Sequence, residues 1–520
     1  MSRIPCQTMR IGTVAVTLTL GTLGCGTASI VCGCITEECL RTLTCDEPPP
    51  ADPAPACEAD PASGRAEDDC GVFISASLGD DANPGTSGLP VRSFERAISL
   101  ARTGPQRVYA CAEAFLEAVT VPSGVEVWGG LDCAHDWLYV GDSRRTVLAP
   151  ESEEIPLQIK GGKGLSRIAD LRLEAADASA PGGSSIAMLV LPGAAVELRR
   201  SELVAGDGAA GAPGQKGGNG PATGGTSGWS GGTACSANVI PGGPAVVTSC
   251  GDTDSIGGEG GVGNVSAGGS GLDGQPEPEP NPLDRGKGGP GQQGGIACIE
   301  GSGGSPGIDG AHGLGGRGPG RITFEGWEGN SGGDGGKGLR GQGGGGGGGS
   351  RGGSLFCGLL PDTPKGGASG GSGGGGGCGG KGGTGGGAGG ASIGLVSFSG
   401  DVILEATSIV TGRGGDGGAG GLAQLGGAQG LPGIGGVGAG GSQAGCAGGW
   451  GGAGGNGGYG GGGLGGPSIG IAHLAGLFPA GHDLAIKIGM PGKGGLGGNE
   501  AVTGSAGEDG ARDDTLGFPQ

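Results

Sequence analysis

Five charged residues carry side chains that could cleave a sugar polymer by acid–base chemistry. They are Asp170, Arg172, Glu197, Arg199 and Arg200. A lyase or hydrolase needs such carboxylates and cations to converge on one groove. At positions 170 to 173 and 196 to 199, however, charged residues alternate with leucine or valine. Because this alternation is typical of a strand with one buried and one solvated face, we expect solvated charges and a chain that is not an enzyme.

The histidines offer no metal site. His135, His312, His473 and His482 are scattered along the sequence. None has the Cys/His or His-x-x-x-His spacing that zinc sites use. We expect His473 and His482, which fall near a predicted strand pair, to be surface or loop residues. The sequence therefore predicts no metal and no cofactor.

The 16 cysteines are many for a cytosolic protein. Cys6 precedes an apolar segment and Cys25 follows it, which leaves an even number for disulfide bonds. These candidates are Cys32, Cys34, Cys39, Cys45, Cys57, Cys70, Cys111, Cys133, Cys235, Cys250, Cys298, Cys357, Cys378 and Cys446. Since no His lies near Cys32 and Cys34, we favour disulfides over a metal there.

The N-terminus has the layout of a signal peptide, residues 1–24. Arg3 and Arg10 precede an apolar stretch, residues 11–23, that is too short to span a bilayer. The following Leu-Gly-Cys resembles the lipobox of bacterial lipoproteins, which implies lipid attachment at Cys25. Thr22 stands where that family prefers Leu, and ordinary cleavage after Ala28 is the alternative. We expect location in the cell envelope, at the outer membrane or cell surface, or otherwise secretion.

Composition limits the function classes. Gly supplies 143 of 520 residues, and aromatic residues are only 3%. Such a chain cannot bury one large apolar core, so ordered Gly-rich parts need dense backbone hydrogen bonding or crosslinks. The net charge of −20 argues against a nucleic-acid partner, because phosphates attract basic surfaces.

Residues 71–205 contain the conventional part of the chain, after a Cys- and Pro-rich tether at 25–70. Short apolar runs alternate with turn residues, as at 72–74, 119–121, 125–128, 146–148, 171–173, 186–190 and 196–198. One amphipathic helix is expected near 93–101. Regularly spaced short strands predict an all-β sandwich, barrel or solenoid.

A resemblance narrows this choice. Residues 72–86, followed by Pro90 and Phe94 to Ile98, resemble the entry segment of right-handed parallel β-helix proteins, which include pectate-lyase-like proteins. That family reads strand, Gly-x-Asp-x-x-x-Pro-Gly-Thr, Pro, Phe and a capping helix. The resemblance implies an all-β, right-handed parallel β-helix, or solenoid. It implies no catalysis, because the entry segment is not the family's active site.

Similar strand pairs recur later, separated by long Gly-rich stretches. The unit beginning Ser185-Ile186 is repeated at Ser392-Ile393 and at Ser468-Ile469. We therefore expect Gly-rich excursions at 206–390 and 414–466, a β-helix rung at 391–413, and a final rung with the C-terminal tail at 467–520.

Glycine recurs at every third position within the excursions, as from 326 to 347, 367 to 385 and 445 to 466. A chain with three residues per turn then presents Gly along one face, and neighbouring backbones can approach closely. This pattern resembles the polyglycine-II-like bundles of springtail antifreeze proteins and some phage adhesin tips. The composition also resembles the repeats of mycobacterial PE-PGRS proteins. The alternative is a disordered coil.

Trp128, Trp137 and Tyr139 lie close in sequence to Cys111 and Cys133. They could form a platform on which a sugar stacks. We favour packing around a Cys111–Cys133 disulfide.

These features predict a non-catalytic structural or adhesive protein of the cell surface, attached to the membrane through a lipid anchor. Polysaccharides or cell-surface molecules are the expected partners, bound by multivalent contacts of flat repetitive faces. The alternatives are a secreted polysaccharide lyase or hydrolase on the same fold and an ice-binding or other flat-surface binding protein.

Overall fold

The computed structural model describes residues 57–519, except 58–59, 65, 152, 252, 354–356 and 358–361. The predicted signal peptide and four of the disulfide candidates, Cys32, Cys34, Cys39 and Cys45, lie outside the described residues, as does Cys25. The described part is nearly all-β, with several parallel sheets and helix α2 (Phe94–Thr103), which confirms the predicted fold class at this level.

Most strands belong to three parallel sheets. The first contains β1 (Val72–Ile74), β2 (Arg107–Cys111), β5 (Glu126–Asp132), β9 (Leu165–Ala169), β12 (Ala195–Arg199), β19 (Val402–Glu405) and β22 (Ala480–His482), with β6 (Leu138–Tyr139) antiparallel to β5. The second contains β3 (Ala114–Phe115), β7 (Thr146–Leu148), β10 (Leu171–Ala175), β13 (Glu202–Ala205), β20 (Ser408–Thr411) and β23 (Ala485–Lys487). The third contains β4 (Val119–Pro122), β8 (Leu157–Lys160), β11 (Ser185–Val190), β18 (Ser392–Ser397), β21 (Ser468–Leu474) and β24 (Arg512–Phe518).

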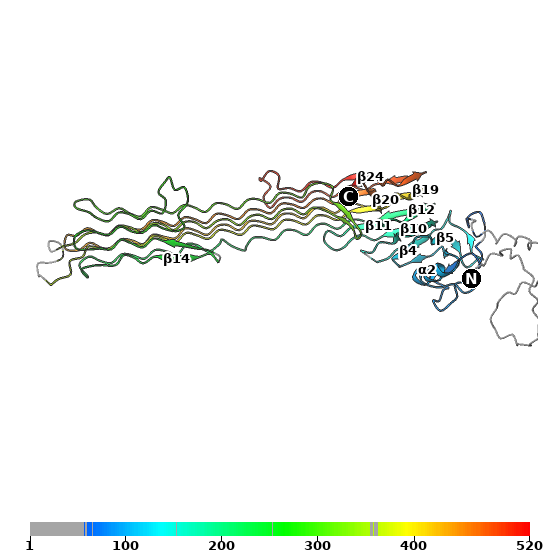
Figure 1. Ribbon diagram of the computed structural model, residues 1–520, viewed down its shortest axis with the longest axis horizontal. Coiled ribbons are helices and arrows are strands. Elements are labelled where there is room, and N and C mark those ends of the chain that lie inside the picture. Colours follow the sequence, from blue (N-terminus) through cyan, green and yellow to red (C-terminus); the bar gives the residue numbers. More distant parts are fainter. Residues whose placement is uncertain are drawn as a thin grey trace, which may run out of the picture. The chain divides into compact units, whose positions relative to one another are not determined.

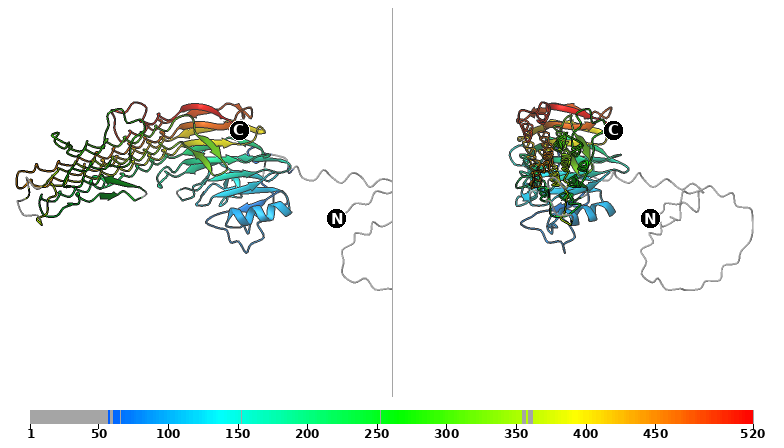
Figure 2. Two further views of the ribbon diagram at one scale, coloured as in Figure 1. Left: turned by 60° about the vertical axis from the view of Figure 1, so that its left-hand side comes forward. Right: turned by 90° about the vertical axis from the view of Figure 1, so that its left-hand side faces the viewer.

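The chain visits the three sheets in turn. Strands β9, β10 and β11 belong to the first, second and third sheets, and β12, β13 and β18 follow the same order. Figure 2 shows the strands stacked in chain order, from blue to red. We call this part, with α2, the sheet stack.

The strand register confirms the repeats predicted from sequence. Ser185 pairs with Ser392, which pairs with Ser468, and Val196 pairs with Val402. These partners are separated by long Gly-rich stretches, yet they lie on adjacent parallel strands. Matching side chains are therefore stacked on one another across the third and first sheets.

The interior of the sheet stack is apolar. Alternate residues of the strands, such as Leu171, Leu173, Val196 and Leu198, are fully buried in one cluster. Helix α2 covers one end of this cluster with Phe94, Ala97, Ile98 and Ala101. Its N-cap is Ser93, whose hydroxyl accepts a hydrogen bond from the Arg96 amide.

One histidine expectation is wrong. His473 is not a surface residue, because it lies within β21 and is only 7% exposed. Its ring packs edge-on against Phe478, and its Nδ1 lies 2.8 Å from the Leu474 carbonyl oxygen. Those contacts satisfy the ring inside the protein.

The Gly-rich segments are inserted where the chain passes from a strand of the second sheet to the next strand of the third sheet. They connect β13 to β18, β20 to β21, and β23 to β24. Figure 1 shows them running alongside one another, away from the sheet stack. Two hairpins lie among them: β14 (Val246–Ser249) with β15 (Asp254–Gly257), and β16 (Arg321–Thr323) with β17 (Gly326–Glu328).

We call these hydrogen-bonded segments the glycine-rich bundle. Its segments are 208–234, 242–264, 268–275, 286–293, 299–316, 329–352, 366–391, 413–437, 445–467, 489–498 and 505–510.

Candidate binding surface

Backbone hydrogen bonds hold the glycine-rich bundle in three directions. In segment 329–352, Gly344 donates to Gly374, Gly345 donates to Ser302, and Gly346 donates to Leu272, each at 2.8 or 2.9 Å. The first two target segments recur with every third residue along the segment, and the third recurs at Gly343, Gly346 and Gly349. A chain that donates to three neighbours in rotation has three residues per turn, the periodicity of a polyproline-II-type helix.

This segment also accepts hydrogen bonds from three further neighbours. Gly258 donates to Gly344, Gly289 donates to Gly346, and Gly449 donates to Gly345. Residues 341–350 of this segment are thus surrounded on all sides by other chains. Residues 366–380 of segment 366–391 are surrounded in the same way, and residues 341–350 and 366–380 are buried throughout.

Close backbone packing requires glycine at these interior positions. A Cβ at Gly345 would overlap the Lys287 carbonyl, and a Cβ at Gly370 would overlap the Gly347 carbonyl. By contrast, Gly220 has open space around the position where a Cβ would lie. The number of glycines in each three-residue turn therefore reflects how much of a segment's circumference is covered by other chains.

The outer segments present side chains to solvent at the third position. Segment 413–437 is hydrogen-bonded to segment 208–234 through the carbonyls of Leu422, Leu425, Leu431 and Ile434. The side chains of these residues and of Val437 are exposed. They form what we call the apolar row. The row was not predicted from the sequence, because glycine dominates the three-residue repeat, although the spacing of three between Leu422, Leu425, Leu431 and Ile434 is visible there.

A second face carries aromatic and polar groups from segments 445–467 and 299–316. The His312 and Tyr459 rings lie 5.4 Å apart, and the Tyr459 amide is 3.1 Å from His312 Nδ1. The Asn456 amide donates to Asp309, and Trp450 on the same segment is 48% exposed. We call Trp450, Asn456, Tyr459 and His312 the aromatic face.

A covering chain marks where the exposed surface begins. Segment 489–498 lies against segment 413–437, whose Gly414, Gly417 and Gly420 donate to it. A Cβ at any of these glycines would overlap a backbone carbonyl. Beyond the end of this covering chain, the corresponding positions carry side chains at Ala423, Gln429 and Pro432, but Gly426 and Gly435 remain glycine because a Cβ there would overlap a carbonyl of segment 445–467.

Three long-range disulfides crosslink the bundle: Cys235–Cys357, Cys250–Cys378 and Cys298–Cys446. Two shorter ones, Cys57–Cys70 and Cys111–Cys133, lie at the start of the described chain. Five disulfides fit an oxidising, extracellular environment. Among the described residues, no helix has the length and apolar character needed to cross a membrane.

The predicted packing around Cys111–Cys133 is confirmed. Trp128 and Trp137 are almost fully buried beside this disulfide, and Tyr139 packs partly buried at the edge of the cluster. Glu113 lies next to both sulfur atoms. Because the sulfurs are joined to each other, they offer no thiolate to a metal ion.

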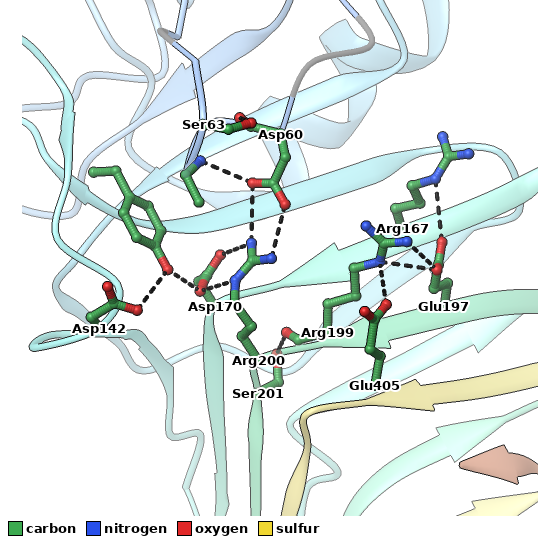
Figure 3. A network of polar contacts seen from close by, with 12 residues as sticks. Asp60, Ser63, Asp142, Arg167, Asp170, Glu197, Arg199, Arg200, Ser201 and Glu405 are labelled. Atoms are coloured by element: carbon green, nitrogen blue, oxygen red, sulfur yellow. Dashed lines mark hydrogen bonds and ion pairs between the residues drawn. The ribbon is translucent and has the colours of Figure 1, made fainter. Parts of the chain in front are cut away.

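The interpretation of Asp170 as a solvated strand residue is wrong. Asp170 is 2% exposed and lies at the corner between β9 and β10 with a left-handed φ of 58°. Arg200, at the equivalent corner between β12 and β13, pairs with it at 2.7 Å and also holds Asp60 at 2.8 Å (Figure 3). Tyr139 donates to Asp170 at 2.8 Å.

This pairing fixes the charge state of the corner. Burial raises the pKa of the Tyr139 phenol, and its hydrogen bond to Asp170 raises it further. The hydrogen bond to Asp170 raises the pKa of Arg200 above its ordinary value, and Asp60 adds to this effect. The corner therefore holds a fixed cation between two carboxylates.

Two of the other candidates, Glu197 and Arg199, belong to a ladder of charges across the first sheet, in which Glu197 is buried rather than solvated as expected. Arg167 lies between Glu126, at 2.8 Å, and Glu197, at 3.3 Å. Figure 3 shows its contact with Glu197. Arg199 lies between Glu197, at 2.5 Å, and Glu405, at 3.1 Å. Opposite charges on adjacent strands stabilise a sheet.

Arg172 stands apart from this ladder. It lies in β10 of the second sheet, where it pairs with Glu174 at 3.1 Å and Glu202 at 2.7 Å. The five sequence candidates are thus divided among the corner, the first sheet and the second sheet. Each has an oppositely charged partner.

A surface cavity of about 1110 Å³ lies beside α2. Its lining includes Phe94, Arg102, Glu117 and Lys160. Burial raises the pKa of Glu117, against the effect of a hydrogen bond from the Phe94 amide. The cavity can accept a small polar molecule, but sequence analysis did not single out any of these side chains as functional.

Comparison with known proteins adds no relative. No family model, curated protein or solved structure matches this chain.

Proposed function

We propose that this chain is a non-catalytic structural or adhesive protein of the cell surface, lipid-anchored at Cys25. Its partners are polysaccharides or other cell-surface molecules. The sheet stack is a right-handed parallel β-helix. The glycine-rich bundle is a polyglycine-II-like arm that displays flat, repetitive faces.

The β-helix assignment is supported by the order in which the chain visits the three sheets. It is also supported by the register of Ser185, Ser392 and Ser468 on adjacent strands. The arm is supported by the rotation of hydrogen-bond donors among three neighbours along segment 329–352.

One observation carries the adhesive role: glycine fills the interior of the bundle, while its outer chains expose side chains at regular intervals. On the aromatic face, Trp450, Tyr459 and His312 project from two adjacent chains. Aromatic rings stack on sugar rings, and a rigid backbone lattice holds them without a large entropic cost on binding. Repetition along the face makes many weak contacts additive.

The charged residues favour binding over catalysis. Asp170, Arg172, Glu197, Arg199 and Arg200 are divided among three places, and each is engaged in an ion pair. A lyase or hydrolase needs such groups to converge where a substrate can reach them.

The test is co-sedimentation of the oxidised protein with insoluble polysaccharides and with intact bacterial cells, followed by assay of released sugar. We expect pelleting without sugar release. Replacing Trp450 and Tyr459 by Ala should weaken pelleting about tenfold, because one exposed and one half-buried aromatic contact are lost. Trp229→Ala removes an aromatic side chain from a different segment and is the matched control.

Sugar release that is lost in Asp170→Asn or Glu197→Gln would replace this proposal with the enzymatic one. Equal pelleting of the aromatic-face variant and the wild type would remove the aromatic face from the proposal.

A further inference from the structure

We infer that the apolar row of segment 413–437 binds the same row of a second copy of this chain, so that two arms associate side by side. The row consists of residues at every third position. They are Leu422, Leu425, Leu431, Ile434 and Val437, which are 47%, 59%, 52%, 67% and 65% exposed.

Isolated exposed leucines are ordinary, but a row of five on one face is not. The inward-facing backbone groups of this segment are already hydrogen-bonded to other segments of the bundle. Its carbonyls accept from segment 208–234, and its glycines donate to segment 366–391. The apolar row therefore points away from the bundle and has no partner among the described residues.

The segment that carries the row and the segment bonded to it are charge-free beside the row, and Lys381 of segment 366–391 is a basic neighbour, bonded to Gln424. No Asp, Glu, Lys or Arg occurs between positions 417 and 482, or between 217 and 251 on the neighbouring segment. The whole chain has 80 such residues, from 30 basic and 50 acidic ones. Interface centres are depleted of charge in the same way.

The spacing of the row identifies the partner. With a rise of about 3.1 Å per residue, side chains three residues apart lie about 9 Å from each other. Same-face residues of a β-strand repeat at about 6.7 Å and those of a helix at about 5.4 Å, so neither stays in register along the row. A second copy of the row has the same repeat and stays in register, so its side chains fit into the gaps between the side chains of the first row.

Ala428 widens one of those gaps. It occupies the third-position site between Leu425 and Leu431 and projects only a methyl group. On the adjacent segment, Ser227 and Ser230 are small and exposed, and Trp229 between them is also exposed. A two-fold related copy can therefore approach closely and bury both rows at once.

The expected interface is long and narrow. From Leu422 to Val437 the row covers 15 residue steps, or about 47 Å. A standard interface buries about 800 Å² on each partner, which at this length needs a width of about 17 Å. Two adjacent chains with their side chains approach but do not exceed this width, so we expect a weak, concentration-dependent dimer.

This dimer rests on one part of the proposed function, the arm with three residues per turn, and does not depend on the adhesive role. A protein that binds no polysaccharide can still form this dimer, and the two tests have separate readouts.

The test is sedimentation velocity of the oxidised full-length chain between about 1 and 100 µM, where weak association is sensitive to mass action. Wild type should shift from monomer to dimer. The variant Leu425→Asp/Leu431→Asp/Ile434→Asp should remain monomeric, with its dissociation constant raised at least about 100-fold.

The matched control is Ile308→Asp/Leu314→Asp/Leu339→Asp. These residues are 70%, 68% and 56% exposed on other segments of the bundle, and this variant should dimerise like wild type. Circular dichroism and a free-thiol assay establish that both variants retain their fold and disulfides.

A charge-pair experiment tests row-on-row contact directly. The corresponding triple Lys variant should also be monomeric alone, and an equimolar mixture of the Asp and Lys variants should recover the dimer. Three outcomes would each overturn the inference. Wild type could stay monomeric at every concentration, the control Asp variant could lose the dimer as completely as the row Asp variant, or the mixture of Asp and Lys variants could stay monomeric. Binding of monomeric wild type to phosphatidylcholine vesicles through this row would also overturn it.

Discussion

The sheet stack and the glycine-rich bundle both rely on inter-chain backbone hydrogen bonds, but they fill their interiors differently. In the sheet stack, strands such as β10 and β12 bury leucine and valine in a common apolar cluster. In the bundle, the interior of segment 329–352 is backbone packed against backbone. The first interior is held by apolar burial, and the second by hydrogen bonds, close approach and crosslinks.

This difference teaches why the two regions have such different sequences. A β-strand pairs with two neighbours in its sheet, so one side chain in two remains free to build a core. A three-residue-per-turn chain in the bundle interior has neighbours all round, and almost no position tolerates a side chain. Four predictions test that comparison, from the largest expected effect to the smallest.

Disulfides should matter more in the bundle than in the sheet stack. Cys298–Cys446 closes a separation of 148 residues, and Cys111–Cys133 closes 22. Loop-closure entropy predicts that replacing the first pair by Ala costs about 5 kcal/mol and the second about 3 kcal/mol. Urea unfolding of the two double variants measures both. Equal losses would mean that crosslinks do not distinguish the regions.

Apolar truncation should harm the sheet stack alone. Leu198 is fully buried, so Leu198→Ala should lower the free energy of unfolding by about 3 to 4 kcal/mol through lost burial and a cavity. Leu339, on the bundle, is 56% exposed, and Leu339→Ala should change it by less than about 0.5 kcal/mol. Thermal denaturation compares them, and a large loss for Leu339→Ala would reveal a bundle held by apolar burial.

The bundle should instead be sensitive to a single added methyl group. Gly345→Ala places a Cβ against the Lys287 carbonyl and should cost about 2 to 3 kcal/mol, because backbone must shift. Gly220→Ala adds the same methyl in open space and should be neutral or stabilising by up to about 1 kcal/mol. Identical melting curves for the two variants would contradict backbone-on-backbone packing.

Acid should weaken the sheet stack before the bundle. Burial raises the pKa of Glu126, but the Trp128 hydrogen bond and the Arg107 and Arg167 guanidiniums together lower it below its ordinary value of 4.5. Stability from this carboxylate is present above that value and is lost as the pH falls through the lower folded-state pKa.

Hydrogen exchange with mass spectrometry, compared at about pH 6 and pH 3 after correction for intrinsic rates, resolves the two regions. Exchange should increase in β5 and β9. The charge-free part of segment 413–437 should not change, and Glu126→Gln should reduce the pH response of β5. Faster exchange in that segment alone would reverse the expected order.

The sequence by itself determined features that depend on near neighbours in the chain. Alternation placed Leu171 and Val196 inside, and recurring Ser-Ile pairs predicted which distant strands would lie side by side. The even cysteine count indicated disulfides. Glycine at every third position indicated close packing, because only three residues per turn bring those positions onto one face.

Only the tertiary structure decided features that depend on which segments meet. It paired Cys298 with Cys446 and placed segment 329–352, rather than 413–437, at the centre of the bundle. It also buried Asp170, because the corner before β10 turns that carboxylate toward Arg200 on the next corner. Such choices follow from contacts between residues 30 to 150 positions apart in sequence, and no local pattern records which of many equivalent glycine-rich chains becomes the neighbour.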